Sequence, residues 1–454
     1  MFQQQFLRLS AALLALLLAG CGSIVHKQSV GHAEGRRKIV VFFDGTHNDE
    51  VSDTNVKRLH SLVALRDQPE LYTLYVEGVG TGSDVLGMGA GSGIGARVRL
   101  GYEFVLQHYR VPEPGQPPKD EIYIVGFSRG AYTARILNSL LYRAGVPKKP
   151  AEKTYTEAAE YVYEAVTGHF DYARNAAVRT PAQIAASLGK HSMHPNAPVR
   201  IRALALWDTV AALGLPEWSL RLADKTGGEA YRPDIDDPSR RYGDTLCNVD
   251  EAYQALSIDD DREWIFTPLP LTRAHLFEGC QGAMRTIKLR EVWFAGAHSD
   301  VGGGYEDTQL SGVSLNWMIT QLAGTGLLPP GTRVREDLHG TSHDPEAGMW
   351  SPLYHRTSRD IAGYPFDPES LRKKTLCVHP SVFERRRFAR PQEHENRQVD
   401  LRWPGKACLV TDDDFRKRRT EVKSSVCERV LEVQMFVQDP EREKTPGCVE
   451  VLTQ

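Results

Sequence analysis

The sequence has no strong excess of charge of either sign. Its 55 lysines and arginines are balanced by 58 aspartates and glutamates, which gives a formal net charge of −3. Nucleic-acid-binding domains carry basic patches or stripes, so this balance argues against a nucleic-acid partner. None of the seven cysteines stands in a C-x-x-C pair. The spacing of a structural zinc site is therefore missing too, and we expect no metal.

The apolar run near the N-terminus is too short to cross a membrane. Leu9–Ala19 is apolar apart from Ser10, whereas a transmembrane helix needs about 20 apolar residues. The run fits the apolar segment of a secretory signal peptide, and it ends in Leu18-Ala19-Gly20-Cys21, which resembles a bacterial lipobox. That resemblance implies a signal peptide over residues 1–20, lipidation of Cys21 and a tether over residues 21–37. Because no aspartate follows Cys21, we expect a periplasm-facing lipoprotein of the outer membrane. An ordinary signal peptide with a coincidental cysteine is the alternative.

Lipidation of Cys21 would leave an even number of cysteines in an oxidising compartment, where disulfides form. They are Cys247, Cys280, Cys377, Cys408, Cys427 and Cys448. Six cysteines allow about 15 connectivities, and the spacing selects none of them.

The glycine-rich stretch from Gly78 to Gly95 lacks the signatures of a nucleotide site. It has neither the Gly-Lys-Ser/Thr ending of a P-loop nor G-x-G-x-x-G spacing after a strand. We therefore expect it to border an active site, and we expect no cofactor.

No internal repeat is visible, and apolar runs predict strands that alternate with helices. Strands are expected at 38–43, 71–76, 122–125, 199–206, 291–294 and 428–437, and helices at 96–109, 131–144, 155–166 and 310–322. This alternation predicts an α/β fold with a mostly parallel sheet covered by helices. We expect a catalytic domain over residues 38–330, with insertions at 148–198 and 214–289. A smaller C-terminal region, 331–454, is expected to be partly integral to that domain.

Two features of the predicted insertions have both a functional and a structural interpretation. Tyrosines and small apolar residues share one face of the expected helix at 155–166. This face could form a lid over an acyl pocket, but we favour the interpretation that it packs into the core. The acidic runs Asp234–Asp237 and Asp259–Asp261 are interpreted as solvated surface, because no calcium-loop spacing accompanies them.

The stretch Ile122–Arg135 organises the rest of the chain. A β-branched strand runs into Gly126-Phe127-Ser128-Arg129-Gly130, and a helical pattern follows. In such a G-x-S-x-G turn the serine stands on a sharp strand-to-helix bend, and the flanking glycines avoid collisions with neighbouring backbone. Ser128 is therefore a candidate nucleophile at a helix N-terminus, where the dipole favours developing negative charge. The alternative is a tight turn with an exposed serine.

Three polar residues each follow an apolar strand directly: Ser128, Asp208 and His298. A serine hydroxyl becomes nucleophilic when an imidazole takes its proton, and a buried carboxylate fixes the imidazole tautomer. Their order along the chain is that of α/β-hydrolase triads. Asp300 is a rival for the carboxylate role, and His379 is the next candidate base.

An oxyanion hole is expected to use the backbone N–H of Arg129, the residue after the nucleophile. A loop at the end of an earlier strand should supply the second donor, with Gly45 or Thr46 as candidates. Asp44 would orient that loop.

Six motifs follow one another along the chain. They are Phe42-Phe43-Asp44-Gly45-Thr46, Gly126-Phe127-Ser128-Arg129-Gly130-Ala131, Trp207-Asp208-Thr209-Val210, Ala255-Leu256-Ser257-Ile258-Asp259, His298-Ser299-Asp300-Val301-Gly302-Gly303-Gly304-Tyr305 and Val378-His379-Pro380-Ser381-Val382. In this order they resemble an uncharacterised family of bacterial and fungal α/β-hydrolases that includes the phospholipase effectors of type VI secretion. The resemblance implies esterase or phospholipase A activity resting on Ser128, Asp208 and His298. The chain departs from those effectors in its lipoprotein signal, which argues against an injected toxin and leaves hydrolysis in place.

The sequence therefore predicts a serine esterase that cleaves phospholipid or lysophospholipid acyl chains. An aspartate-nucleophile phosphatase is the first alternative, because Asp44-Gly45-Thr46 follows a hydrophobic strand. A non-enzymatic envelope lipoprotein is the second.

Overall fold

The computed structural model describes residues 24–45, 53–66, 68–78, 93–168, 179–211, 239–240, 242–260, 262, 266–278, 280, 286–345, 359, 376–379, 381–382, 407–409 and 431–434. The signal peptide, Cys21, Thr46, most of the glycine-rich stretch and the acidic run at 234–237 lie outside these residues.

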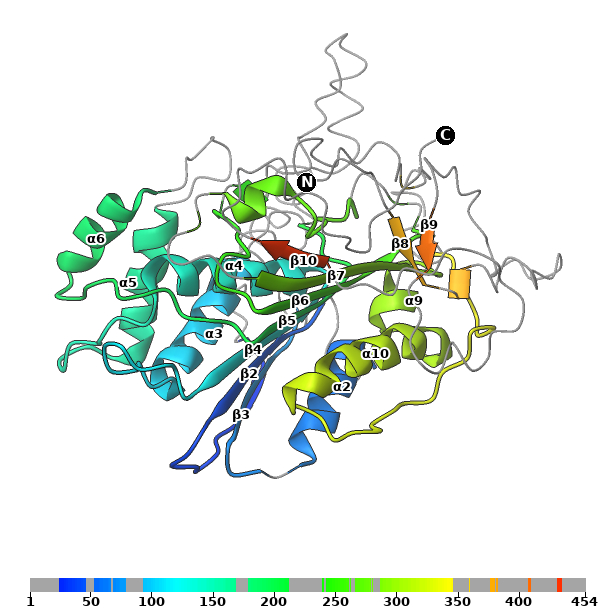
Figure 1. Ribbon diagram of the computed structural model, residues 1–454, viewed down its shortest axis with the longest axis horizontal. Coiled ribbons are helices and arrows are strands. Elements are labelled where there is room, and N and C mark those ends of the chain that lie inside the picture. Colours follow the sequence, from blue (N-terminus) through cyan, green and yellow to red (C-terminus); the bar gives the residue numbers. More distant parts are fainter. Residues whose placement is uncertain are drawn as a thin grey trace, which may run out of the picture.

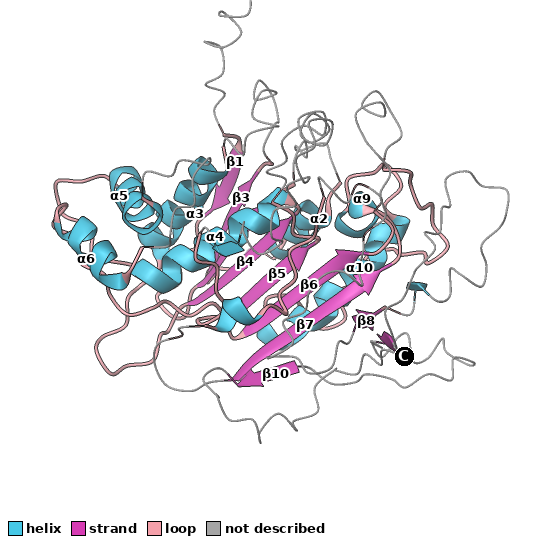
Figure 2. Ribbon diagram, turned by 90° about the horizontal axis from the view of Figure 1, so that it is seen from above, coloured by secondary structure: helices cyan, strands magenta, loops and turns pink. Residues whose placement is uncertain are grey.

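Ten strands of the described residues form one sheet, in the order β1-β3-β2-β4-β5-β6-β7-β8-β9, with β10 on β7 (Figures 1 and 2). The pairs of β1 with β3 and of β10 with β7 are antiparallel, and all the others are parallel. The strands are β1 (His26–Ser29), β2 (Lys38–Phe43), β3 (Leu71–Val76), β4 (Glu121–Phe127), β5 (Ala203–Trp207), β6 (Glu251–Ser257), β7 (Thr286–Phe294), β8 (Leu376–Val378), β9 (Ala407–Leu409) and β10 (Leu431–Gln434).

Helices cover both faces of this sheet (Figure 1). On one face lie α3 (Ile94–His108), α4 (Arg129–Ala144), α5 (Tyr155–Thr167) and α6 (Pro181–Gly189). The other face carries α2 (Asn55–Ala64), α9 (His298–Gly302) and α10 (Gln309–Leu322). The described residues also form two short 3₁₀ turns, η2 (Ala274–Phe277) and η3 (Ala323–Thr325). The expected α/β-hydrolase-like fold, with a mostly parallel sheet between helical layers, is confirmed.

The strand sequences explain why two helical layers are needed. In β2, Ile39, Val41 and Phe43 belong to the core under α3 and α4, whereas Val40 and Phe42 belong to the core under α2 and α10. Successive side chains of a strand point to opposite faces. A strand that is apolar at every position must therefore be covered on both sides, as parallel sheets generally are.

Two expectations about domain boundaries are wrong. The segment expected to be a tether contributes β1, which pairs with β3 through His26 and Ser29, because a polar strand can pair through its backbone at an exposed sheet edge. The expected insertion at 214–289 contains β6, which lies between β5 and β7 in the middle of the sheet. The strand β6 is therefore integral to the domain.

The expected helices are present, with shifted ends, and α2 was not anticipated. The apolar face of α5 is core: Ala158, Ala159 and Val162 are buried. The lid interpretation concerned the tyrosines of this helix. Tyr163 is partly buried against the core, whereas Tyr155 is exposed. Among the described residues, no helix is long and apolar enough to span a membrane.

Among the described residues a disulfide joins Cys247, just before β6, to Cys280, after η2. The two residues are 33 positions apart in sequence, and their Cα atoms lie 5.3 Å apart, within the range that a disulfide bridges without strain.

Candidate active site

Ser128 stands on a strained turn between β4 and α4. Its φ of 59° and ψ of −128° lie in a region that L-residues rarely adopt. Neighbouring backbone surrounds this turn so closely that only glycine fits beside it. A Cβ on Gly126 would lie 2.6 Å from the Cα of Ala131, and a Cβ on Gly130 would lie 2.3 Å from the carbonyl oxygen of Phe43.

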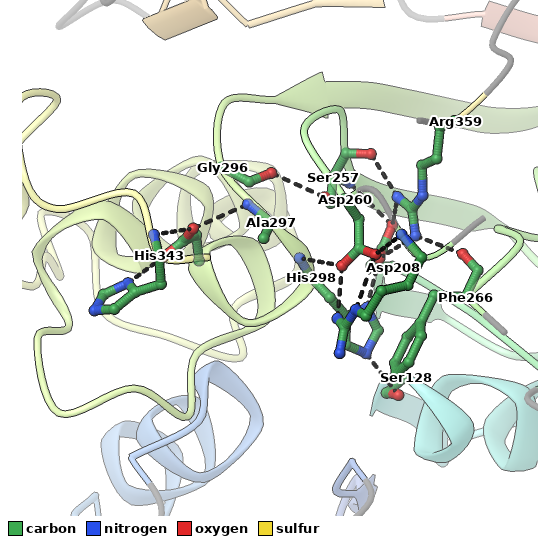
Figure 3. Close-up of polar contacts among 12 residues, drawn as sticks. Ser128, Asp208, Ser257, Asp260, Phe266, Gly296, Ala297, His298, His343 and Arg359 are labelled. Atoms are coloured by element: carbon green, nitrogen blue, oxygen red, sulfur yellow. Dashed lines mark hydrogen bonds and ion pairs between the residues drawn. The ribbon is translucent and has the colours of Figure 1, made fainter. Parts of the chain in front are cut away.

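The turn brings the Ser128 hydroxyl to the imidazole of His298. Ser128 Oγ lies 2.7 Å from His298 Nε2, and His298 Nδ1 lies 2.5 Å from Asp208 Oδ2 (Figure 3). The three residues follow β4, β5 and β7, so parallel strands deliver them to the same edge of the sheet. The hydrogen-bond pattern fits an imidazole that carries its proton on Nδ1 and accepts from the serine at Nε2.

His298 is enclosed, and its surroundings favour the neutral ring. Burial lowers the pKa of His298, although the hydrogen bond and charge of Asp208 partly oppose that effect. The rings of Phe127 and Phe266 flank the imidazole, with centroid distances of 4.7 and 4.8 Å. A neutral imidazole can accept a proton from the serine at neutral pH.

Asp208 is fully buried and receives four hydrogen bonds. Besides His298, its carboxylate accepts from the backbone N–H of Ser257 at 2.9 Å and from both terminal nitrogens of Arg359, each at 2.8 Å. Burial raises the pKa of Asp208, but the charge of Arg359 and the contact with His298 more than offset burial and keep that pKa below its usual range. The carboxylate therefore stays ionised. No pattern in the sequence indicated Arg359.

A second carboxylate, Asp260, holds the backbone of His298. Asp260 Oδ2 accepts from the His298 N–H at 3.1 Å, and Arg262 pairs with the same oxygen at 2.7 Å. Burial raises the pKa of Asp260, whereas Arg262 lowers it strongly, and the net shift is downward. The expectation that Asp259–Asp261 is solvated surface is wrong for Asp260, which has no exposed area, because Arg262 compensates its buried charge.

This geometry coincides with a family match. Residues 37–321 match the family described as the T6SS phospholipase effector Tle1-like catalytic domain, and that range contains Ser128, Asp208 and His298. The chain belongs to this family.

This Tle1-like chain is similar to proteins from yeast and bacteria. An uncharacterized protein of Saccharomyces cerevisiae is 25% identical over 268 residues, which make up 53% of this chain and 34% of the relative. An uncharacterized protein from Pseudomonas aeruginosa has a solved structure that is 20% identical, with a TM-score of 0.37, covering 64% of this chain and 46% of that one. The propionate-bound esterase Est2 of Thermogutta terrifontis is 16% identical, with a TM-score of 0.35, covering 69% and 94% of the two chains. The chain thus spans about one third of the curated yeast relative.

Asp300 of the Tle1-like domain does not take the place of Asp208 beside the His298 ring. Its Oδ1 lies 2.6 Å from Nδ1 of His343, and its Oδ2 accepts from the backbone N–H groups of Ala297 and His343 at 2.9 and 3.0 Å. Asp300 therefore supports the start of α9, which carries His298, and ties it to the chain beyond α10.

His379, the alternative base, lies at the end of β8 and packs elsewhere. Its ring stacks on Phe294 at 4.5 Å, and its Nδ1 lies 3.0 Å from Ser381 Oγ. Burial lowers the pKa of His379 to about 3. Ser128 Oγ has its hydrogen bond with His298 instead.

The loop after β2 differs in part from the expectation. The Gly45 N–H donates to the Asp44 carboxylate at 2.7 Å, so it points into the protein, and Gly45 is not the second oxyanion donor in this arrangement. The other Asp44 oxygen accepts from Thr54 at 2.7 Å and Tyr75 at 2.5 Å. Thr46 lies outside the described residues. Among the described residues, no group of three or more His, Cys, Asp or Glu side chains could hold a metal ion.

Proposed function

We propose that this protein is a serine hydrolase that cleaves carboxylic ester bonds, with Ser128 as nucleophile, His298 as general base and Asp208 as the supporting carboxylate. The observation that carries the proposal is the continuous path from Ser128 Oγ to His298 Nε2, at 2.7 Å, and from His298 Nδ1 to Asp208 Oδ2, at 2.5 Å. Distances of this size permit proton transfer without rearrangement.

In the first step Ser128 Oγ attacks the ester carbonyl carbon while its proton passes to His298 Nε2. The carbonyl electron pair moves to the oxygen, and the resulting oxyanion collapses with loss of the alkoxide, which takes the proton from His298. Water then attacks the acyl-serine with the same base and releases the fatty acid. Asp208 stabilises the imidazolium in both steps and keeps its own charge.

The oxyanion is proposed to accept from the backbone N–H of Arg129. Arg129 is the first residue of α4, so its N–H stands at the positive end of the helix dipole, directly after Ser128. The loop beyond Gly45 is proposed to supply the second donor, with Thr46 as the candidate.

The substrate is proposed to be an acyl ester of a phospholipid or lysophospholipid. The support is membership in a family of phospholipase effector catalytic domains. The chemistry requires no cofactor, because nucleophile, base and oxyanion donor all come from the chain itself.

The alternative of an aspartyl nucleophile at Asp44 is less well supported. Both Asp44 oxygens accept hydrogen bonds from Gly45, Thr54 and Tyr75, and the residue is 2% exposed. A nucleophilic carboxylate needs an oxygen that can reach the phosphorus atom. The three donors instead give Asp44 a structural role at the end of β2.

The experiment is a turnover measurement with soluble p-nitrophenyl esters, phospholipid vesicles and a phosphate monoester. Ser128→Ala, His298→Ala and Asp208→Asn should each lower ester turnover by about 10³- to 10⁴-fold while the fold is kept. Near-full ester turnover in His298→Ala would show that another residue is the general base. Magnesium-dependent phosphatase activity that disappears in Asp44→Asn would favour the alternative. No turnover of any substrate would favour an envelope lipoprotein without catalysis.

We further propose that Cys21 is lipidated and anchors the protein in the outer membrane, facing the periplasm. The register of the sheet indicates how far such an anchor would lie from Ser128. His26 pairs with Val76, Val76 with Phe43 and Phe43 with Gly126, so β1 begins at the sheet edge that carries Ser128. With strands about 4.8 Å apart, His26 lies about 14 Å from Gly126.

Cys21 is only five residue steps from His26, a reach of at most about 18 Å. A lipid on Cys21 would therefore hold the membrane near the edge where esters are cleaved. Acyl labelling that is present in the wild type and absent in Cys21→Ser would support the anchor. Mass spectrometry that finds an unmodified N-terminus beyond Cys21 would exclude it.

A further inference from the structure

Arg359 belongs to the chain beyond the family match, which ends at residue 321, yet it lies inside the candidate active site (Figure 3). Its side chain has no exposed area. Its terminal nitrogens donate to both oxygens of Asp208 and also to two backbone carbonyls, those of Ser257 and Phe266. A buried guanidinium with four such acceptors is held in one orientation.

We propose that Arg359 is a positioning residue for the ester hydrolysis proposed above: it fixes the Asp208 carboxylate in the orientation that His298 needs, so that a residue from beyond the family match completes the active site. The inference rests on the proposed function, because it assigns Arg359 a task only if Asp208 supports a catalytic His298.

Arg359 limits rotation of the Asp208 carboxylate. Without Arg359 the carboxylate would keep only the Ser257 N–H on Oδ1 and His298 on Oδ2. The planar fork of an arginine binds both oxygens at once and so resists rotation of the carboxylate about its Cβ–Cγ bond. Lysine, with a single nitrogen, cannot bridge the two oxygens in the same way.

Arg359 also holds the backbone of Phe266. The Arg359 Nη2 atom donates to the Phe266 carbonyl at 2.7 Å, and the Phe266 ring packs on His298 at 4.8 Å. Arg359 thus links the ends of β5 and β6, at Asp208 and Ser257, to the loop that shields the imidazole. Chain segments from three parts of the sequence meet at this one guanidinium.

Arg359 also contributes to the balance of charge around His298. In the part of the chain that the structure describes, the charged groups beside His298 are two carboxylates, Asp208 after β5 and Asp260 after β6, and two arginines, Arg262 and Arg359. Removal of Arg359 leaves two carboxylates against one arginine. The protonated imidazole becomes more favourable, so the free enzyme should lose activity at a higher pH on the acid side.

The test compares Arg359→Gln and Arg359→Lys with a matched control, Arg135→Gln. Arg135 is also a buried arginine, 1% exposed in its side chain, paired with Asp244 at 2.6 Å. The kcat and KM for a soluble ester are measured across pH 5–9 in the full chain, together with the melting temperature of each variant.

For Arg359→Gln we expect kcat to fall by on the order of 100-fold, the cost of a misplaced catalytic group. We expect little change in KM. We also expect the fall of kcat/KM at low pH, the acid limb of the profile, to occur at a higher pH. Arg359→Lys keeps the charge and loses the fork, so its kcat should fall while the acid limb stays in place. Arg135→Gln should melt at a lower temperature without moving the limb.

The proposal is overturned if Arg359→Gln keeps both the wild-type kcat and the wild-type acid limb. It is also overturned by a second result, in which the acid side of the kcat/KM profile of Arg359→Gln does not move and its loss of kcat is the same, for a given loss of melting temperature, as that of Arg135→Gln. Arg359 would then be purely structural. If Arg359→Gln does not fold, wild-type kcat in Arg359→Lys refutes the need for the fork. Failure of the proposed function is distinguishable, because the wild type itself would then lack ester turnover that depends on Ser128.

Discussion

Replacing Ser128 by glycine should make the protein more stable than replacing it by alanine. The φ of 59° and ψ of −128° at this position cost an L-residue about 1–3 kcal/mol, whereas glycine adopts them readily. Glycine in place of alanine also lowers the free energy of unfolding by about 0.5–1 kcal/mol, because the unfolded chain has more conformational freedom at a glycine. The difference predicts a free energy of unfolding that is about 0–2.5 kcal/mol higher for Ser128→Gly than for Ser128→Ala.

Ser128→Ala is a matched control because both variants lose the same hydroxyl and its hydrogen bond to His298. The residue is 3% exposed, so solvent contributes little to the difference. Urea unfolding followed by circular dichroism, with the disulfide kept oxidised, gives the two midpoints. An alanine variant that is as stable as the glycine variant, or more stable, would show that the turn carries no backbone strain.

Three further predictions concern the framework of the site. Gly130→Ala should abolish ester turnover or prevent folding, because its Cβ would lie 2.3 Å from the carbonyl oxygen of Phe43; an active Gly130→Ala variant would contradict the elbow geometry. Reduction of Cys247–Cys280, which closes a loop of 33 residues, should lower the free energy of unfolding by about 3–4 kcal/mol, and an unchanged urea midpoint in reductant would refute this. Burial raises the pKa of Asp44 from 3.8 to about 6, so the folded state binds more protons than the unfolded state in that window and stability should fall as pH rises from about 4 to about 6. Melting temperatures measured from pH 4 to pH 7 should decline less in Asp44→Asn than in the wild type, and parallel curves would contradict the assignment.

The sheet was predictable wherever its strands are continuously apolar. The predicted bounds of β2 and β3 match the structure, because fully buried parallel strands need apolar residues on both faces. β6 was missed because Glu251, Gln254 and Ser257 interrupt its apolar pattern. Each of these polar side chains has a hydrogen-bond partner in the structure, so a central strand could accommodate them.

The candidate site was predictable only where residues follow strands. Ser128, Asp208 and His298 each stand at a strand end, and parallel strands place such residues at one edge of the sheet. Arg359 is 151 positions from Asp208 in sequence. Its contact with Asp208 joins distant parts of the chain, and local patterns do not encode such a contact.

The orientation of Gly45 was unpredictable for a related reason. The sequence places it correctly after β2, but the Asp44 side chain takes up its N–H at 2.7 Å. The backbone conformation decides whether the Gly45 N–H binds this side chain or a substrate. The order of residues alone does not reveal that conformation.

Covalent labelling with a fluorophosphonate probe tests the central claim most directly. A serine activated by His298 should form a stable phosphonyl adduct, which peptide mass spectrometry should locate on Ser128. Labelling should be insensitive to chelator, and it should be lost in His298→Ala because the hydroxyl no longer has a base. An unlabelled wild-type protein that hydrolyses phosphate monoesters with magnesium, and stops doing so in Asp44→Asn, would contradict the account.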